Sequence, residues 1–212
     1  MRPALPPRVY LPLMPLLGIG LFVGLYGWAT VLYPGGSTAD HTTVGFNWLT
    51  NYWCDLTGET AKNGQPNPAS PVATVAMIVL CVSLAAFWFT LPRLFSQPRQ
   101  LQALTRYPGV TATIVAPFIA SAYHDAAINL VGILALPPLL LTGLGLYQGR
   151  HTGLLAAGGA CLLLVLLNNV IYHGNWHIDW LPVVQKCTFL AVLGWIGSIS
   201  WRVYRVDLQA AI

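Results

Sequence analysis

Long hydrophobic stretches separated by short polar segments run through the whole chain of 212 residues. A helix that crosses a bilayer needs about 20 predominantly apolar residues, and six stretches approach or reach that length. They are Val9–Tyr33, Pro71–Leu91, Pro108–Tyr123, Ala127–Tyr147, Gly153–Tyr172 and Pro182–Trp201. The pattern predicts an all-α fold: an integral membrane bundle of six transmembrane helices, in which residues 1–212 form a single transmembrane domain.

The composition excludes an ordinary water-soluble domain. Hydrophobic residues make up 56% of the chain and charged residues only 8%, whereas a soluble domain carries about 25% charged residues. The first apolar stretch is longer than the roughly 7–15-residue core of a cleavable signal peptide, so we expect it to be retained as a span. Phosphate-binding loops, nucleophile elbows and nucleic-acid signatures are missing from the sequence. The expected partners are the lipid bilayer and, as an alternative left open, other membrane subunits, but no nucleic acid.

The arginines predict the orientation in the membrane. If the chain makes six passes, all eight arginines lie on one side: Arg2, Arg8, Arg93, Arg99, Arg106, Arg150, Arg202 and Arg205. Lys and Arg concentrate in cytoplasmic loops, so both termini are predicted to be cytoplasmic, in the inner membrane of a bacterium. Four of the five histidines and five of the six carboxylates then lie at the opposite face. This division predicts a polar site that faces the outer side.

The longest polar stretch, residues 34–70, is the predicted outer loop. Its segment FNWLTNYWCDLTGE contains four aromatic residues and no basic residue, and such aromatic residues favour the boundary between bilayer and water. We expect a short interfacial helix or a re-entrant segment there. Asp55 lies between aromatic and apolar neighbours and is expected to face inward, whereas Glu59 is expected to lie in water.

A metal site is the first chemical hypothesis for the outer face. His173 and His177 are four residues apart, a spacing that places both on one face of a helix and suits zinc or another divalent metal. His124, at the neighbouring outer turn, would supply the third ligand. Asp55 or Asp125 would act catalytically, by orienting an imidazole or by taking a proton from a metal-bound water.

Structural roles for the same residues stay open beside the metal hypothesis. If Gly174 and Asn175 end the helix, His173 and His177 are exposed loop residues. Asp125 can equally cap the span that follows it, by accepting hydrogen bonds from its first backbone N–H groups.

Three further residues are candidates for contact with lipid or a partner: Lys186, Trp53 and Trp176. Lys186 lies near the start of the last span, where it can pair with Asp55 or Asp125 or extend to the lipid headgroups. Cys54 and Cys187 are both expected near the same boundary. A disulfide between them is an open alternative in an oxidising compartment.

Short motifs resemble those of a known family. NYWCDLTGETAKNGQPNP, HDAAINLVGILALP and LPVVQKCTFLAVLGWIGSISWRV together resemble a bacterial six-span membrane family catalogued as a domain of unknown function, number 998. Its outer turn is matched with one residue more between Asp and Gly, and its closing span begins here with Lys186 in place of Arg. Its His with a small polar neighbour is matched by His124 and Asp125. The resemblance implies a six-span architecture with an outer site, but no particular reaction.

A second likeness concerns Ser121, His124 and the His173/His177 pair. These residues are similar to the Ser…His and HxxxH elements of the superfamily that holds alkaline ceramidases and progestin/adipoQ-type receptors. That likeness implies a zinc amide hydrolase with seven spans, one more than predicted here.

Two classes of function follow from these patterns. We favour a multi-pass membrane protein that acts as a binding or partner subunit, or as a sensor of an unidentified ligand, through its outer His/Asp site. The alternative is a metal-dependent membrane hydrolase that acts on a lipid or another amphiphile. A transporter is disfavoured because the middle of every predicted span lacks ionisable residues.

Overall fold

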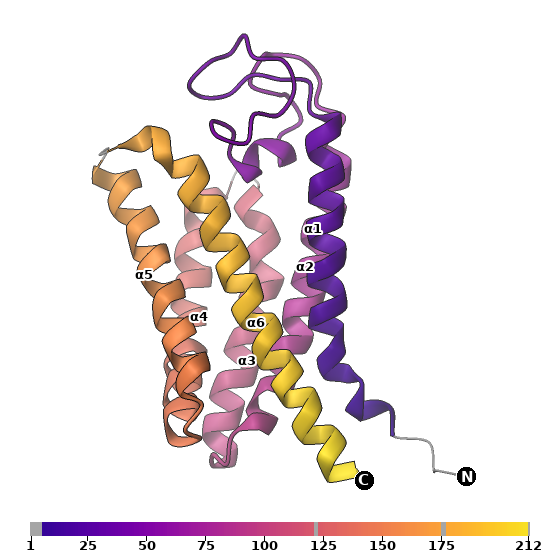
Figure 1. Cartoon of the computed structure of the whole chain (residues 1–212), viewed down its shortest axis with the longest axis vertical. Helices are drawn as coiled ribbons and strands as arrows, with labels where there is room; N and C mark the ends of the chain where they lie inside the picture. The colour runs from indigo at the N-terminus through magenta and orange to yellow at the C-terminus, as the bar shows by residue number, and fades with distance from the viewer. Residues whose placement is uncertain (1–5, 121–122, 175–176, 212) are drawn as a thin grey trace. The chain divides into compact units, whose positions relative to one another are not determined.

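Helices dominate the computed structural model (Figure 1), which describes residues 6–120, 123–174 and 177–211 without the side chains at 119–120 and 124–125. These ranges contain no β-strand, only two isolated bridges. Their α-helices are α1 (Met14–Leu32), α2 (Ser70–Thr90), α3 (Arg99–Val115), α4 (His124–Gln148), α5 (Thr152–Gly174) and α6 (Leu181–Ala211). Their 3-10 helices are η1 (Pro7–Val9), η2 (Leu11–Leu13), η3 (Trp53–Thr57), η4 (Leu91–Leu94), η5 (Ala116–Ala120) and η6 (Ile178–Trp180). The all-α prediction is confirmed for this part of the chain.

Several of these helices have the length and composition of membrane spans. Within the described ranges, five segments are long and apolar enough to cross a bilayer: Pro7–Leu32, Ser70–Leu94, Ala126–Gln148, Thr152–Gly174 and Ile178–Ala211. The chain therefore has the helices of a multi-pass membrane protein.

The predicted third span, Pro108–Tyr123, differs from the observed helix. α3 begins at Arg99 and carries Arg106, so its first half is polar, and the α-helix ends at Val115 before the 3-10 turn of η5. Helix formation needs backbone hydrogen bonds rather than apolar side chains, so the helix extends into the polar segment that the hydrophobic pattern left out. As a result α3 is not among the five helices that meet the length and composition of a span.

The contacts of the chain divide it into two compact units. The first comprises residues 1–20, 79–157 and 194–212, and the second comprises residues 21–78 and 158–193. α3 and α4 belong to the first unit, whereas α1, α2, α5 and α6 each contribute to both.

Small residues allow helices of the first unit to approach one another closely. A Cβ added to Gly109 of α3 would lie 2.5 Å from a ring atom of Trp88 in α2. α3 also packs along α4. At the beginning of α5, the carbonyl of Leu154 accepts a 2.8 Å hydrogen bond from Nε1 of Trp195 in α6. An indole N–H inside a bilayer needs such an acceptor, because no water is available there.

An aromatic core lies at the centre of the second unit. The Trp53 ring of η3 packs edge-on against Phe22, Tyr26 and Phe189, with centroid distances of 5.9, 5.5 and 5.6 Å. Each such pair contributes about 0.5–1.5 kcal/mol beyond the burial of its area. Phe22 and Tyr26 belong to α1 and Phe189 to α6, so Trp53 attaches η3 to both helices.

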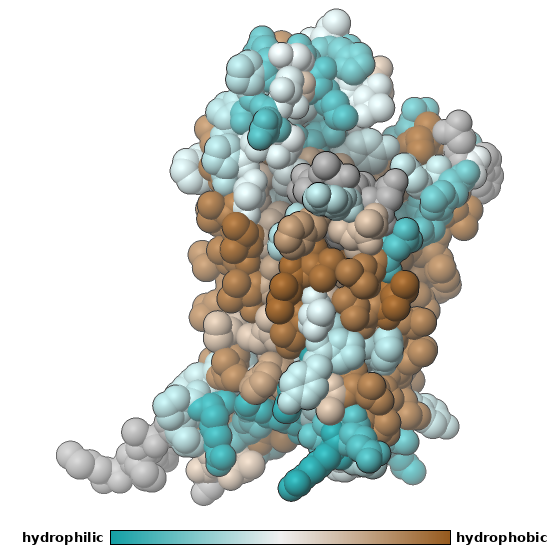
Figure 2. Space-filling model, turned by 180° about the vertical axis from the view of Figure 1, so that it is seen from behind, coloured by the Kyte–Doolittle hydropathy of each residue, from teal (hydrophilic) through white to brown (hydrophobic). Residues whose placement is uncertain are grey.

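Apolar side chains cover the outside of the helices. Leu17, Leu21 and Val31 of α1, for example, are 68%, 58% and 80% exposed. Hydrophobic residues (brown) cover much of the helical surface on the face shown in Figure 2, whereas the loop after α1 is largely hydrophilic (teal). Apolar exposure on this scale is a liability in water and is ordinary for helices that lie in lipid.

Candidate functional site

Residues 33–69, between α1 and α2, fold into a compact loop that we call the cap. Gly35 and Gly36 have φ angles of 139° and 78°, and a Cβ at either position would collide with the backbone of Thr43 or of Asn63. The close approach allows Gly36 N–H to donate to the Thr43 carbonyl at 2.8 Å and Asn63 N–H to donate to the Gly35 carbonyl at 3.2 Å. The cap is thus closed by its own backbone hydrogen bonds.

Short polar side chains explain why the cap is a loop. Asp40, Asn47, Asn63 and Asn67 each accept a hydrogen bond from the backbone N–H two residues further on. Such Asx turns compete with the hydrogen bonds of a helix. The segment expected to hold a short interfacial helix or a re-entrant segment contains one short helix, the 3-10 helix η3. Its position at the bilayer boundary stays a prediction.

Asn51 is the centre of the hydrogen-bond network in the cap. Its residue is fully buried. Its Nδ2 donates to the Gly36 carbonyl at 2.7 Å and to Asp55 Oδ2 at 3.0 Å, and its Oδ1 accepts from Asn47 N–H at 2.9 Å. One amide thus joins the beginning of the cap to η3.

Asp55 faces inward, as its sequence neighbours predict, and its carboxylate is held on both oxygens. Oδ2 accepts from Asn51 Nδ2 and, at 2.9 Å, from Tyr52 N–H, while Oδ1 lies 3.7 Å from Nζ of Lys62. The side chain of Asp55 is 4% exposed and that of Lys62 is 42% exposed. A buried carboxylate with this set of donors supports the backbone of the cap. A catalytic role for Asp55 stays a prediction. Glu59 is exposed, as predicted.

Lys186 and Gln185 connect α6 to the cap. Lys186 is buried, with 7% of its surface exposed, and its Nζ donates a 2.6 Å hydrogen bond to the carbonyl of Asn51. Asp55 also acts on this ammonium group electrostatically. Gln185 Oε1 accepts from Trp53 N–H at 3.1 Å. Lys186 therefore does not extend to the lipid headgroups. We call Asn51, Asp55 and Lys186 the clamp, because together they tie the cap to α6.

Two of the three residues proposed to contact lipid or a partner are buried. Trp53, like Lys186, is buried, with 5% exposed, and its Nε1 has no hydrogen-bond partner among the described residues. Trp176 lies outside the described residues. Exposed apolar side chains of the cap are found instead at Val44, Trp48 and Leu49, which are 95%, 52% and 68% exposed. We call these three residues the apolar rim.

The geometry predicted for the two histidines is wrong. α5 ends at Gly174, and His177 follows it with a left-handed φ of 52°. His173 and His177 are therefore not successive positions on one helical face, although both are exposed, as expected if the helix ends between them. The His173 ring packs edge-on against Tyr172, with centroids 5.1 Å apart.

The metal site gains no support from the described side chains. Among them, no three His, Cys, Asp or Glu side chains come together in a group that could hold a metal ion. The side chains of His124 and Asp125, which the predicted site needs, lie outside the described part, and so does Ser121. A metal at His124, His173 and His177 stays a prediction.

The cysteines are free thiols. Cys54 and Cys187 are both exposed and are not bridged. Burial of part of the Cys54 side chain, together with the charge of Asp55, raises the pKa of its thiol. Elsewhere in the cap, burial raises the pKa of the Tyr33 phenol, and hydrogen bonds from the hydroxyl and N–H of Thr42 lower the pKa of Asp40.

A second polar group lies in the first unit. Arg93 Nη1 donates to Asp207 Oδ2 at 2.8 Å and to the Arg8 carbonyl at 3.1 Å. These residues line a hollow of about 270 Å³ together with Val9, Ala210 and Ala211. The contact joins the N-terminal segment, η4 and the end of α6.

The comparisons with known proteins give no relative: no family model, no curated protein and no solved structure matches the chain. The two resemblances seen in the sequence motifs therefore stay predictions.

Sequence reasoning missed the residue on which the site depends. Asn51 contacts Gly36 and Lys186, which are 15 and 135 positions away, so no local pattern marks it. Asn67 was missed in the same way: its Nδ2 donates to the carbonyl of Gly58 at 2.7 Å and holds the end of η3. A weak signal existed, since each Asn lies within an apolar or turn-forming segment where a polar amide needs a partner.

Proposed function

We propose that this chain is a multi-pass membrane protein that acts as a non-catalytic binding subunit, in which the cap presents the apolar rim to a partner protein on the outer side. The clamp is the observation that carries this proposal. In the clamp, Asp55 and Lys186 are buried and support the fold of the cap. The exposed apolar side chains of the rim are available for recognition. Aromatic and large apolar residues are typical of the centre of protein interfaces.

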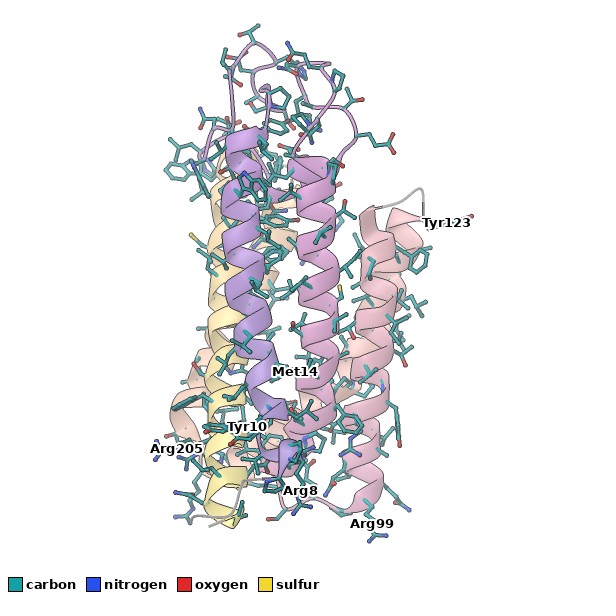
Figure 3. All side chains as sticks on the ribbon, turned by 90° about the vertical axis from the view of Figure 1, so that its right-hand side faces the viewer. Arg8, Tyr10, Met14, Arg99, Tyr123 and Arg205 are labelled. Atoms are coloured by element: carbon teal, nitrogen blue, oxygen red, sulfur yellow. The ribbon has the colours of Figure 1, made fainter. Side chains whose placement is uncertain are left out.

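The proposed topology has six passes, with α3 and η5 together forming the third and both termini in the cytoplasm of a bacterium. Arg93 contacts both the Arg8 carbonyl and Asp207, which favours placing the N-terminal segment and the end of α6 on the same side. Within the first unit, Figure 3 shows Arg8, Arg99 and Arg205 toward one end and Tyr123, at the beginning of α4, toward the other. The positive-inside tendency then places the arginines in the cytoplasm and the cap outside.

Photocrosslinking tests the binding role. A photoreactive phenylalanine analogue replaces Trp48 in the rim or, as a control, Trp28 in α1; the two side chains are 52% and 56% exposed. Because the two side chains are similarly exposed, a difference in crosslinking between the positions does not come from a difference in exposure. After irradiation of intact cells, we expect a discrete protein adduct at position 48 and lipid adducts alone at position 28. Lipid adducts alone at both positions would reject a partner at the rim.

The hydrolase alternative is tested on the same preparation. Metal analysis of purified wild type and of His173→Ala should give the same metal content under the binding proposal. Stoichiometric zinc in the wild type that disappears in His173→Ala would favour the hydrolase instead.

A further inference from the structure

We propose that α5 is a self-association surface, on which a second copy of this chain docks through Asn169. The proposal concerns residues 159–173 of the second unit and does not involve the cap. Of the five described helices that could span a membrane, α5 is the least covered. In its most apolar 18-residue stretch 11% of the residues are buried, against 17% in α4 and 33–39% in α1, α2 and α6.

Two adjacent asparagines on α5 have different environments. Asn168 Nδ2 donates to Thr188 Oγ1 of α6 at 2.6 Å and to the carbonyl of Leu164, so this side chain faces α6. Asn169 is rotated by about 100° from it around the helix, and it is exposed. Its Nδ2 donates a 2.9 Å hydrogen bond to the carbonyl of Val165 in its own helix. Among the described residues, none donates a hydrogen bond to its Oδ1.

An exposed amide inside a span is unfavourable in lipid. Asn side chains in transmembrane helices therefore hydrogen-bond across helix interfaces. The residues on the same face of α5 follow the spacing of a helix–helix seam, with alternating steps of three and four residues. They are Gly159, Leu162, Leu166, Asn169 and His173. All five are exposed, and a Cβ added to Gly159 would meet no atom within 4 Å, so the face is open to a neighbouring helix.

The chemistry of the amide favours a second copy as the occupant. Two copies in one membrane have the same orientation, so a twofold axis along the membrane normal brings the same residues of α5 together. Asn carries both a donor and an acceptor, so Asn169 of one copy can bind Asn169 of the other reciprocally. A single Asn at a seam position also fixes register in parallel helix pairs.

Association is measured with the full-length chain in lipid vesicles, by energy transfer between donor-labelled and acceptor-labelled copies over a range of protein-to-lipid ratios. We expect the wild type to dimerise and Asn169→Leu to raise the dissociation constant about tenfold, the size that model peptides give for loss of an interhelical hydrogen bond. Asn169→Gln, which keeps the amide, should retain most of the association. Leu167→Ala is the matched control, since Leu167 is 42% exposed and lies about 100° around α5 from Leu166.

Two outcomes would overturn the proposal. One is a wild type that stays monomeric at every protein-to-lipid ratio, which would mean that a different membrane protein or lipid covers the Asn169 face. The other is equal dissociation constants for the wild type and for a folded Asn169→Leu variant. Because the assay does not involve the apolar rim, either result would leave crosslinking at position 48 unaffected, so failure of this inference is distinguishable from failure of the proposed function.

Discussion

Replacing Asn51 by alanine should open the cap without unfolding the helices. The substitution removes three side-chain hydrogen bonds, two of them to the buried acceptors Gly36 O and Asp55 Oδ2. The buried Gly36 carbonyl loses its side-chain donor, which costs about 1–3 kcal/mol. Asp55 Oδ2 keeps its bond from Tyr52 N–H, so the lost bonds to Asp55 and from Asn47 N–H contribute about 1 kcal/mol each. The free energy of opening the cap should therefore fall by about 3–5 kcal/mol.

Proteolysis of the cap in lipid vesicles measures this change. A soluble protease that cleaves only the opened cap should act on Asn51→Ala at least about 100-fold faster than on the wild type, since 1.4 kcal/mol corresponds to a factor of 10. Asn63→Ala is the matched control, because Asn63 makes a single exposed side-chain bond within the cap, to Gln65 N–H. Cleavage of Asn51→Ala within threefold of Asn63→Ala would refute the central place of Asn51 in the cap.

Three further predictions concern other parts of the chain. Gly109→Ala should lower the free energy of unfolding of the detergent-solubilised protein by about 1–3 kcal/mol, because the new methyl group meets the Trp88 ring. Gly132→Ala should leave this free energy unchanged, because a Cβ at Gly132 has open space around it. The pKa of Asp40 is lowered in the folded cap, so its carboxylate stabilises the cap at neutral pH, and this contribution is lost as the pH falls through the folded pKa; Asp40→Asn should flatten the acid side of a pH profile of proteolysis. Cys54 should react with a membrane-impermeant maleimide added outside the membrane. Because the pKa of its thiol is raised, the reaction rate should still increase with pH where the rate of an ordinary thiol is constant. No labelling from outside at any pH would contradict the proposed orientation.

The sequence predicted the long apolar helices more accurately than the contacts of the candidate site. The predicted span Gly153–Tyr172 agrees closely with α5, Thr152–Gly174, because a bilayer requires a continuous apolar segment and the sequence records it directly. The start of α3 was mispredicted because the first turns of this helix are polar, and a search for apolar stretches does not detect polar turns. Asp55 was correctly expected to face inward, since its immediate neighbours are apolar.

The contacts of the site could not be predicted because they join distant segments. The role of Asn51 depends on Lys186, 135 residues away, and on a loop conformation fixed by two glycines. The His173/His177 pair shows the opposite error. A spacing of four implies a shared face only while the helix continues, and here α5 ends at Gly174, between the two.

Hydrogen–deuterium exchange of the protein in lipid nanodiscs tests most directly whether the clamp holds a folded cap. Tyr52 N–H is bonded to the Asp55 carboxylate at 2.9 Å, and Asp55 N–H to the Tyr52 carbonyl at 3.2 Å. In the wild type we expect these amides to exchange far more slowly than in an unstructured chain, and Lys186→Met, which removes the donor to the Asn51 carbonyl, should accelerate them. Exchange at the unstructured rate in the wild type, or no change in Lys186→Met, would contradict a cap held by Asn51, Asp55 and Lys186.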